Sequence, residues 1–373
     1  MASKILMGDM PELMDRILMN LKTEFRSLHS CALVNRHWCK MSIPILWRDP
    51  FSFMENQAII SGYFSSLDDD GKLILKEYGI IPNFPNTLFH YARFLKVLDL
   101  SHFGYRVEQW IDFQLSNIEK NAKNKLKYDI TNLLFKILIK SGATLSTLFL
   151  NDSDIFKVNS EISYLLERNT YFFSQLQDLF VSESSEYNVE NVIKLLKILP
   201  SNATNLSELK IRIFNIYDTQ LFHAFISIIK SQKHLEWFKF HGSEKKIIPE
   251  FDDVISALEN QNRALKGIQI ALCEFSTEFE VLWKFENLEV ISIVCSDEQK
   301  ILKLVNTDLC KISTLEICSY ESIEAANIIQ ILENSGQLLQ QFKLDSGENE
   351  IYSQSLLLEI LINFCQNITY LYI

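Results

Sequence analysis

The stretch NLSELKI at residues 205–211, followed by HLEWFKF at residues 234–240, decides the fold of this 373-residue chain. Both are copies of one apolar pattern, xLxxLxL, which occurs ten times, with its first apolar position at residues 95, 145, 176, 206, 235, 265, 288, 312, 339 and 368. After a first step of 50 residues, the remaining steps are 23 to 31 residues long. A motif that returns at such a period indicates stacked structural units.

Each copy predicts a short β-strand, because its last two apolar residues are two positions apart and therefore share one face. Apolar residues at helical spacing lie between copies, for example over residues 187–199 and 353–365. One strand and one helix in each period predict an α/β fold, in which a curved parallel sheet carries outer helices. An ordinary α/β sheet is the competing interpretation, although such a fold rarely repeats one strand motif so often.

This pattern resembles the leucine-rich repeat, and the resemblance implies a solenoid over residues 94–373, with a helical connector and N-terminal cap at residues 51–93. The family usually has Asn or Cys three positions after the last strand leucine, and only Cys273 matches here. The hydrogen bonding of those turns is therefore open. Residues 101–144 hold either a degenerate repeat or an insertion, since the polar run at residues 121–127 is typical of a loop.

The first fifty residues predict a compact helical unit. Asp9-Met10-Pro11-Glu12 is typical of a helix start, and one apolar helical face follows at residues 10, 13, 14, 17, 18 and 21. After an interruption over residues 23–27, helical spacing resumes and continues to residue 43, where Pro44 is expected to end it. A unit of this size cannot bury its own apolar faces.

The order of residues in this unit resembles the F-box motif: Met10-Pro11-x-Leu13-x-x-x-Ile17-x-x-x-Leu21, then Leu28-x-x-Cys31-Ala32-Leu33-Val34-x-Arg36-x-Trp38. Ile45-Leu46-Trp47-Arg48 resembles the continuation in many fungal members, and Met10 stands where the family usually has leucine. The resemblance implies docking on a Skp-type adaptor, and through it on a cullin, by Met10, Pro11, Leu13, Ile17, Leu21, Val34 and Trp38. Alternatively, these residues form only the core of a helical cap on the repeats.

The strand register also predicts a binding surface. Residues that flank the last leucine of each strand point away from the buried face, and neighbouring repeats stack them side by side. The result is an aromatic step beside a basic patch, formed by Phe149, Phe180, Lys210, Arg212, Trp237, Lys239 and His241. Such a surface suits an acidic or phosphorylated peptide with an apolar anchor. The alternative is a solvated face with no ligand.

Composition excludes several classes of protein. A net charge of -11 argues against a nucleic-acid binder, which needs a concentrated basic surface. No apolar run reaches about 18 residues and the N-terminus lacks an apolar signal stretch, so we expect no membrane association and a cytoplasmic or nuclear location. Seven cysteines without a CxxC spacing argue against a disulfide framework and a zinc ribbon.

No motif for catalysis, a metal or a cofactor is found. His29, Cys31, His37 and Cys39 lie close together, but residues two apart on a helix point in different directions and could not share a metal. The sequence contains no GxxxxGK[ST], GxGxxG, HExxH or GxSxG. We therefore expect no catalytic site in this chain, although isolated pairs of His and Asp leave an unrecognised enzyme as a distant alternative.

The function predicted from these features is that of a substrate-recognition subunit of an SCF-type cullin-RING ubiquitin ligase, in which other subunits transfer ubiquitin. The main alternative is a leucine-rich-repeat scaffold that does not engage the ligase. The last copy, at residues 367–373, predicts a strand with no helix after it. Since an uncovered strand invites pairing, we expect either more chain after Ile373, or self-association or recruitment of a partner through residues 353–373.

Overall fold

The structure, a computed structural model, describes residues 10–53, 58–81, 84, 86–115, 119–151, 158–183, 189–213, 218–243, 250–272, 279–295, 311–319, 325–335, 338–346 and 354–372. The chain forms two compact units. Unit 1 spans Met1–Leu176 and Glu190–Ile198, and unit 2 spans Gln177–Val189 and Leu199–Ile373. Parallel strands alternate with helices in both, so the α/β class predicted from the repeats is confirmed.

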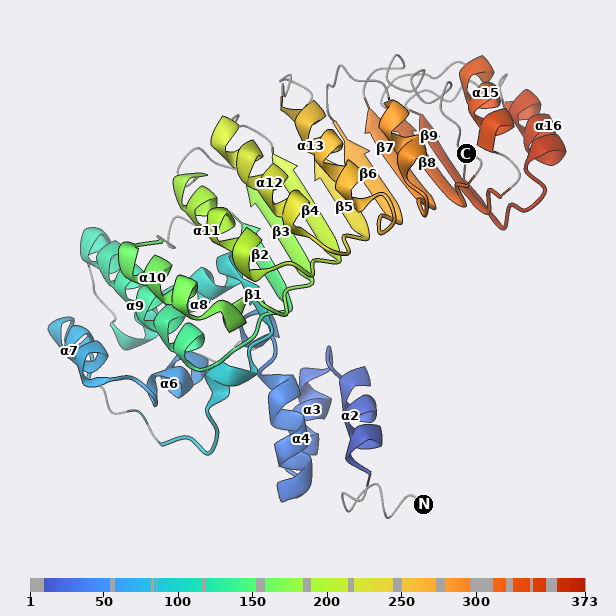
Figure 1. Cartoon of the computed structure of the whole chain (residues 1–373). Helices are drawn as coiled ribbons and strands as arrows, with labels where there is room; N and C mark the ends of the chain where they lie inside the picture. Colours follow the sequence, from blue (N-terminus) through green and yellow to red (C-terminus); the bar gives the residue numbers. More distant parts are fainter. Residues whose placement is uncertain are drawn as a thin grey trace. The chain divides into compact units, whose positions relative to one another are not determined.

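Unit 1 begins with a helical head made of α2 (Pro11–Asn20), α3 (Phe25–Ala32) and α4 (Arg36–Leu46), in which α4 contacts both other helices (Figure 1). Met10 is the N-cap of α2, so this helix begins within the start predicted at residues 9–12. Asn35 caps α4 by accepting a hydrogen bond from the Trp38 backbone N–H at 2.9 Å. The stop expected at Pro44 is wrong, because α4 continues to Leu46. Proline in the last turn removes only one backbone bond, and Trp47 N still donates to Ile43 O at 3.0 Å.

The rest of unit 1 carries one strand pair among helices. Its elements are α5 (Pro50–Phe53), α6 (Ala58–Phe64), α7 (Asp69–Glu77), η1 (Tyr91–Phe94), β1 (Val97–Asp99), α8 (Leu100–Gln114), α9 (Lys120–Lys140), β2 (Thr147–Asn151), α10 (Ser160–Arg168), η2 (Thr170–Phe172) and residues 190–198 of α11 (Val189–Asn202). Strand β1 pairs in parallel with β2, with Val97 opposite Thr147.

Helices α8 and α9 occupy most of the stretch between the first two copies of the repeat motif, and the loop expected at residues 121–127 is wrong because it belongs to α9. Leu126 of this polar run is fully buried. Lys123 Nζ pairs with Asp112 Oδ1 at 2.6 Å and Lys127 Nζ with Glu108 Oε2 at 2.5 Å. Ion pairs with the preceding helix α8 thus stabilise the polar start of α9 as a helix.

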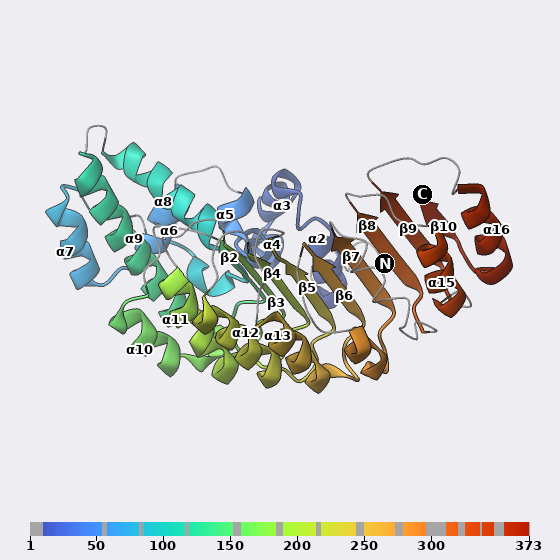
Figure 2. The same cartoon turned by 90° about the horizontal axis from the view of Figure 1, so that it is seen from above.

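Unit 2 is a parallel sheet of β3 (Asp178–Glu183), β4 (Glu208–Ile213), β5 (Trp237–His241), β6 (Gly267–Ala271), β7 (Val290–Cys295), β8 (Thr314–Ser319), β9 (Gln341–Ser346) and β10 (Tyr370–Tyr372), in chain order. Its helices are α12 (Thr219–Ser231), α13 (Phe251–Leu258), η3 (Glu259–Gln261), η4 (Phe279–Lys284), α15 (Ala325–Ser335) and α16 (Gln354–Phe364). Figures 1 and 2 show α12 and α13 together on one side of the sheet.

Burial alternates along the strands as the repeat motif predicts. In β4, Leu209 and Ile211 are buried, whereas Lys210 and Arg212 are half-buried on the opposite face. The same alternation holds in β2, β5 and β8. One face of each of these strands therefore belongs to the core, and the other carries half-buried side chains.

Two buried glutamines bond the backbone where strands begin. Gln232 Oε1 accepts from Leu206 N at 2.9 Å, and Gln261 Oε1 accepts from Leu235 N at 3.2 Å. The amide of Gln261 also donates to Gln232 O at 2.9 Å. These residues satisfy buried backbone groups in the turns before β4 and β5. Cys273 is the one position with the Asn or Cys that is usual in the turns of leucine-rich repeats, and it lies outside the described residues.

The head is attached to the strand pair of unit 1 by a backbone contact that also recurs between the repeats. Lys96 O accepts from Ser146 N at 2.7 Å and from Thr147 N at 3.1 Å. In the same way Arg48 O, at the end of the head, accepts hydrogen bonds from Lys96 N at 2.9 Å and from Val97 N at 3.0 Å. The end of the head thus takes the place that a preceding repeat would occupy beside β1.

Candidate functional site

Helix α2 divides its apolar side chains between two surfaces. Met14 and Leu18 are 1% and 0% exposed and lie in the core of the unit, whereas Leu13 and Ile17 are 37% and 49% exposed. Met10, at the N-cap, is 36% exposed. The single apolar face expected from the sequence is therefore wrong in part. One side of α2 holds the head together, and the neighbouring side is open to solvent.

The other residues predicted to bind the adaptor are also placed at least partly outside the core. Pro11 is exposed and Val34 is 60% exposed, while Leu21 and Trp38 are half-buried. Leu33, which the sequence analysis did not select, is 74% exposed beside Val34. Its place next to a matched motif position was the signal that could have identified it. The head thus exposes the apolar side chains of Met10, Leu13, Ile17, Leu33 and Val34 to solvent.

The second candidate is a surface of unit 2, here called the open face: the half-buried side chains of β3, β4 and β5 on the side opposite the core. Strand register places Phe180, Lys210 and Lys239 in one row, and Arg212 beside His241 in the next. Phe149 lies on β2 of unit 1, where it is also half-buried. The proximity predicted for Phe149 and Phe180 therefore stays a prediction.

The Trp237 indole lies over the neighbouring strand β6 on the open face. A Cβ added to Gly267, its register partner on β6, would lie 2.1 Å from Cζ3 and 2.3 Å from Cε3 of the indole. The ring therefore occupies the space that any side chain at this position would need, and Gly267 is required for this close approach. Gly267 was not predicted from the sequence, although it occupies the position of Trp237 in the next copy of the motif.

The charges of the open face are partly matched. Lys239 Nζ pairs with Glu208 Oε1 at 2.8 Å and lies 5.7 Å from the centre of the Trp237 ring. Among the described residues, no carboxylate lies within ion-pair distance of Lys210. Burial, followed by the positive charges of Arg212 and Lys210, lowers the pKa of the His241 imidazole. Lys210 and Arg212 thus lie close enough to His241 to disfavour its protonated form.

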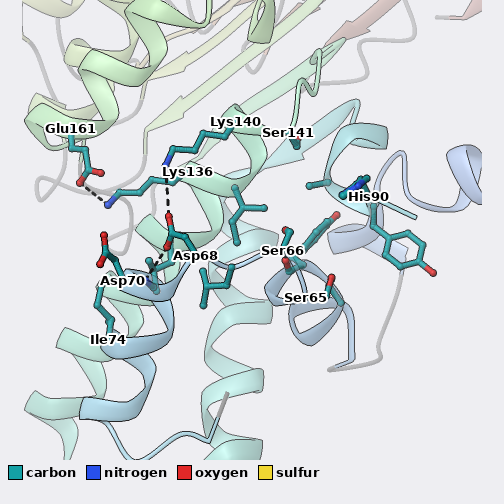
Figure 3. A pocket seen from close by; sticks show the side chains of 18 residues that line it. Ser65, Ser66, Asp68, Asp70, Ile74, His90, Lys136, Lys140, Ser141 and Glu161 are labelled. Carbon is teal, nitrogen blue, oxygen red and sulfur yellow. Dashed lines mark hydrogen bonds and ion pairs between the residues drawn. The ribbon is translucent and has the colours of Figure 1, made fainter. Parts of the chain in front are cut away.

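Unit 1 contains a pocket of about 490 Å³ among α6, α7, η1, α9 and α10 (Figure 3). Lys136 Nζ pairs with Glu161 Oε2 at 2.6 Å, and Lys140 Nζ lies 3.9 Å from Asp68 Oδ2. Asp68 also caps α7 by accepting from Gly71 N at 2.9 Å. Both lysines in the wall of the pocket thus have a carboxylate partner. None of the site residues predicted from the sequence lines this pocket. Five separate segments build this pocket, so no sequence motif could show it.

A serine, a histidine and an aspartate meet in unit 1 without forming a catalytic triad. Ser52 Oγ lies 3.2 Å from His102 Nδ1, and Asp99 Oδ2 lies 3.6 Å from the same nitrogen. A triad needs the nucleophile and the acid on opposite nitrogens of the imidazole. Asp99 instead caps α8, accepting from the backbone of Ser101 at 2.9 Å and of His102 at 3.2 Å. Helix capping explains this arrangement.

The described residues contain no group of three His, Cys, Asp or Glu side chains that could hold a metal ion, and this includes the region around His29, Cys31, His37 and Cys39. No helix in the same ranges is both long enough and apolar enough to cross a membrane.

Comparison with known proteins adds little. No family model matches the chain, and no curated protein matches it. Among solved structures, a DUF72 family protein from Enterococcus faecalis is similar over 77% of this chain and 92% of that chain, with 12% sequence identity and a TM-score of 0.18. A likeness at that TM-score carries no argument about fold or function.

Proposed function

We propose that this chain is the substrate-recognition subunit of an SCF-type cullin-RING ubiquitin ligase, in which an F-box head binds a Skp-type adaptor and leucine-rich repeats hold the substrate. One observation carries the proposal. Leu13 and Ile17 are exposed on α2 while Met14 and Leu18 fill the core of unit 1. If the head served only as a cap on the repeats, these apolar residues would be covered by the chain, whereas Leu13 stays 37% and Ile17 49% exposed.

The attachment of the head supports the same function. Besides the bonds to Arg48 O, Trp47 stacks on Tyr91 at 3.9 Å between ring centroids and meets Tyr63 edge-on at 5.3 Å. Backbone and aromatic contacts thus fix the end of α4 to the rest of unit 1. An adaptor subunit works by positioning its substrate for a reaction that other subunits perform, and such positioning requires a firm attachment.

Copurification of the full chain with a Skp-type adaptor tests the proposal. The double variant Ile17→Asp/Trp38→Ala is expected to lose the adaptor, whereas Arg16→Ala, a change on the polar side of α2, should keep it. The repeats should stay folded in both variants, which circular dichroism would verify. Adaptor binding that survives the double change would contradict the F-box assignment. A wild-type chain that binds no adaptor would favour a repeat scaffold outside the ligase.

A further inference from the structure

Arg48 holds the same backbone position beside β1 that Glu236 holds beside β6. Arg48 O accepts a hydrogen bond from Lys96 N at 2.9 Å. Glu236 O accepts one from Lys266 N at 2.8 Å, and in both places the same oxygen also accepts from the residue after the lysine. Lys96 and Lys266 each follow the first apolar residue of their copy of the motif. The pairs Arg48–Lys96 and Glu236–Lys266 are therefore equivalent in the backbone and differ in the charge of their first member.

The pair beside β6 is neutral, whereas the pair beside β1 carries two positive charges. Lys266 Nζ lies 3.0 Å from Glu236 Oε1. Burial, followed by the positive charge of Arg48, lowers the pKa of the Lys96 ammonium. Among the described residues, no carboxylate lies within ion-pair distance of Arg48 or Lys96. Asp49, the next residue, directs its carboxyl group to Ser52 instead. The two cations thus repel each other, and an anion between them would relieve that repulsion.

Hydrogen-bond donors without an acceptor accompany the two charges. Lys96 Nζ donates to Thr144 Oγ1. A protonated lysine has no acceptor atom, so the Thr144 hydroxyl accepts this bond and its own O–H remains to donate. The Arg48 guanidinium donates to no other described residue. All three side chains are half-buried, which strengthens their interaction with an anion relative to full exposure.

A phosphate group matches this set of donors. It carries a charge of about -1.5 to -2 at neutral pH and three strong acceptor oxygens, and a guanidinium binds two of those oxygens at once. A carboxylate has a single charge for two cations. The net charge of -11 disfavours a nucleic acid, which would bring many phosphates to an acidic chain.

We propose that Arg48, Lys96 and Thr144 bind one phosphate group, free or on a small ester, which supplies between the head and β1 the negative charge that Glu236 supplies beside β6. The site uses none of the residues proposed to bind the adaptor or the substrate. The inference therefore goes beyond the proposed function and does not rest on it.

Calorimetric titration of the purified full chain with sodium phosphate, at constant ionic strength, tests the site. Phosphate is expected to bind at least tenfold more tightly than acetate. Lys96→Gln and Arg48→Gln each remove one cation and should weaken phosphate at least tenfold, and circular dichroism would verify that both variants fold. Lys266→Gln is the matched control, because it removes a lysine at the same motif position that already has a carboxylate partner. It should change the affinity less than twofold.

Arg48→Glu gives the pair beside β1 the charges of the pair beside β6. This variant should bind no phosphate and should melt at a higher temperature than wild type in phosphate-free buffer, because Lys96 gains a partner within the chain. If Arg48→Glu does not fold, Lys96→Gln still decides the question.

Glycerol phosphate identifies the source of the anion. Tighter binding of this ester than of inorganic phosphate, lost in Lys96→Gln, would assign the site to a small phosphate ester. Equal or weaker binding of the ester would assign it to free phosphate, and both results support the site. Phosphate that binds no more tightly than acetate would overturn the proposal. So would unchanged affinity in Lys96→Gln, or a loss in Lys266→Gln equal to that in Lys96→Gln.

Discussion

Replacing Ile17 by aspartate separates the surface of the head from its core. Ile17 is 49% exposed, and fully burying an isoleucine side chain is worth roughly 1.5–3 kcal/mol, so docking would gain about 1 kcal/mol from the exposed half. An aspartate there would add the cost of an unpaired carboxylate in an apolar interface, at least about 2 kcal/mol. Together they amount to about 3 kcal/mol or more, which weakens adaptor binding more than about 100-fold.

Met14 provides the matched contrast on the same helix. It is 1% exposed, so Met14→Ala is expected to cost about 2–5 kcal/mol of stability and to lower the melting temperature of the full chain. Ile17 is half-exposed, so Ile17→Asp gives up about 1 kcal/mol of burial and should destabilise the chain less than Met14→Ala does. Calorimetric binding to the adaptor and differential scanning calorimetry measure the two effects. Adaptor affinity within threefold of wild type in Ile17→Asp, or a melting loss equal to that of Met14→Ala, would refute the reasoning.

Three further predictions concern the attachment, Gly267 and pH. Trp47→Ala removes the half-buried ring stacked on Tyr91 and should cost about 2 kcal/mol, with faster amide exchange at the start of β1 as the check. Gly267→Ala should destabilise by about 1–3 kcal/mol through its clash with Trp237, and much less in a Trp237→Ala background, which a double-mutant cycle would reveal. Because the folded-state pKa of His241 lies below its unfolded value of about 6.5, wild type should lose stability relative to His241→Gln as pH falls below about 6.5, and pH-dependent denaturation would test this.

The strands could be predicted from the sequence because their signal is local. Leu209 and Ile211 are two positions apart, and this period alone places them on one face and Lys210 on the other. The helix at residues 353–365 was predicted for the same reason, and α16 covers Gln354–Phe364. Repetition then fixed the register, since each copy of the motif pairs with the next at equivalent positions.

Helix α2 shows where such a pattern stops being informative. Periodicity identifies Leu13, Met14, Ile17 and Leu18 as one apolar stripe, but it does not say which neighbour covers each part of the stripe. Helix α4 contacts α2, and Met14 and Leu18 are buried while Leu13 and Ile17 stay partly open to solvent. The helical start of α9 was not predicted for a related reason. Its lysines pair with carboxylates on α8 rather than within their own segment.

The open face shows that the charge of a sheet surface must be derived across strands. Counted along the chain, Lys239 adds a third cation to Lys210 and Arg212, but its ammonium pairs with Glu208 on the adjacent strand. In the strand register Glu208 lies opposite Trp237, and Lys239 is two residues further along β5, so the ion pair runs diagonally between the strands. A comparison of equivalent motif positions alone does not reveal such a pair. Gly267 is equally invisible along the chain, because its role is to leave room for a ring from β5. A repeat sequence therefore predicts which side chains share a face, whereas their ionic partners and the space around them depend on contacts between successive repeats.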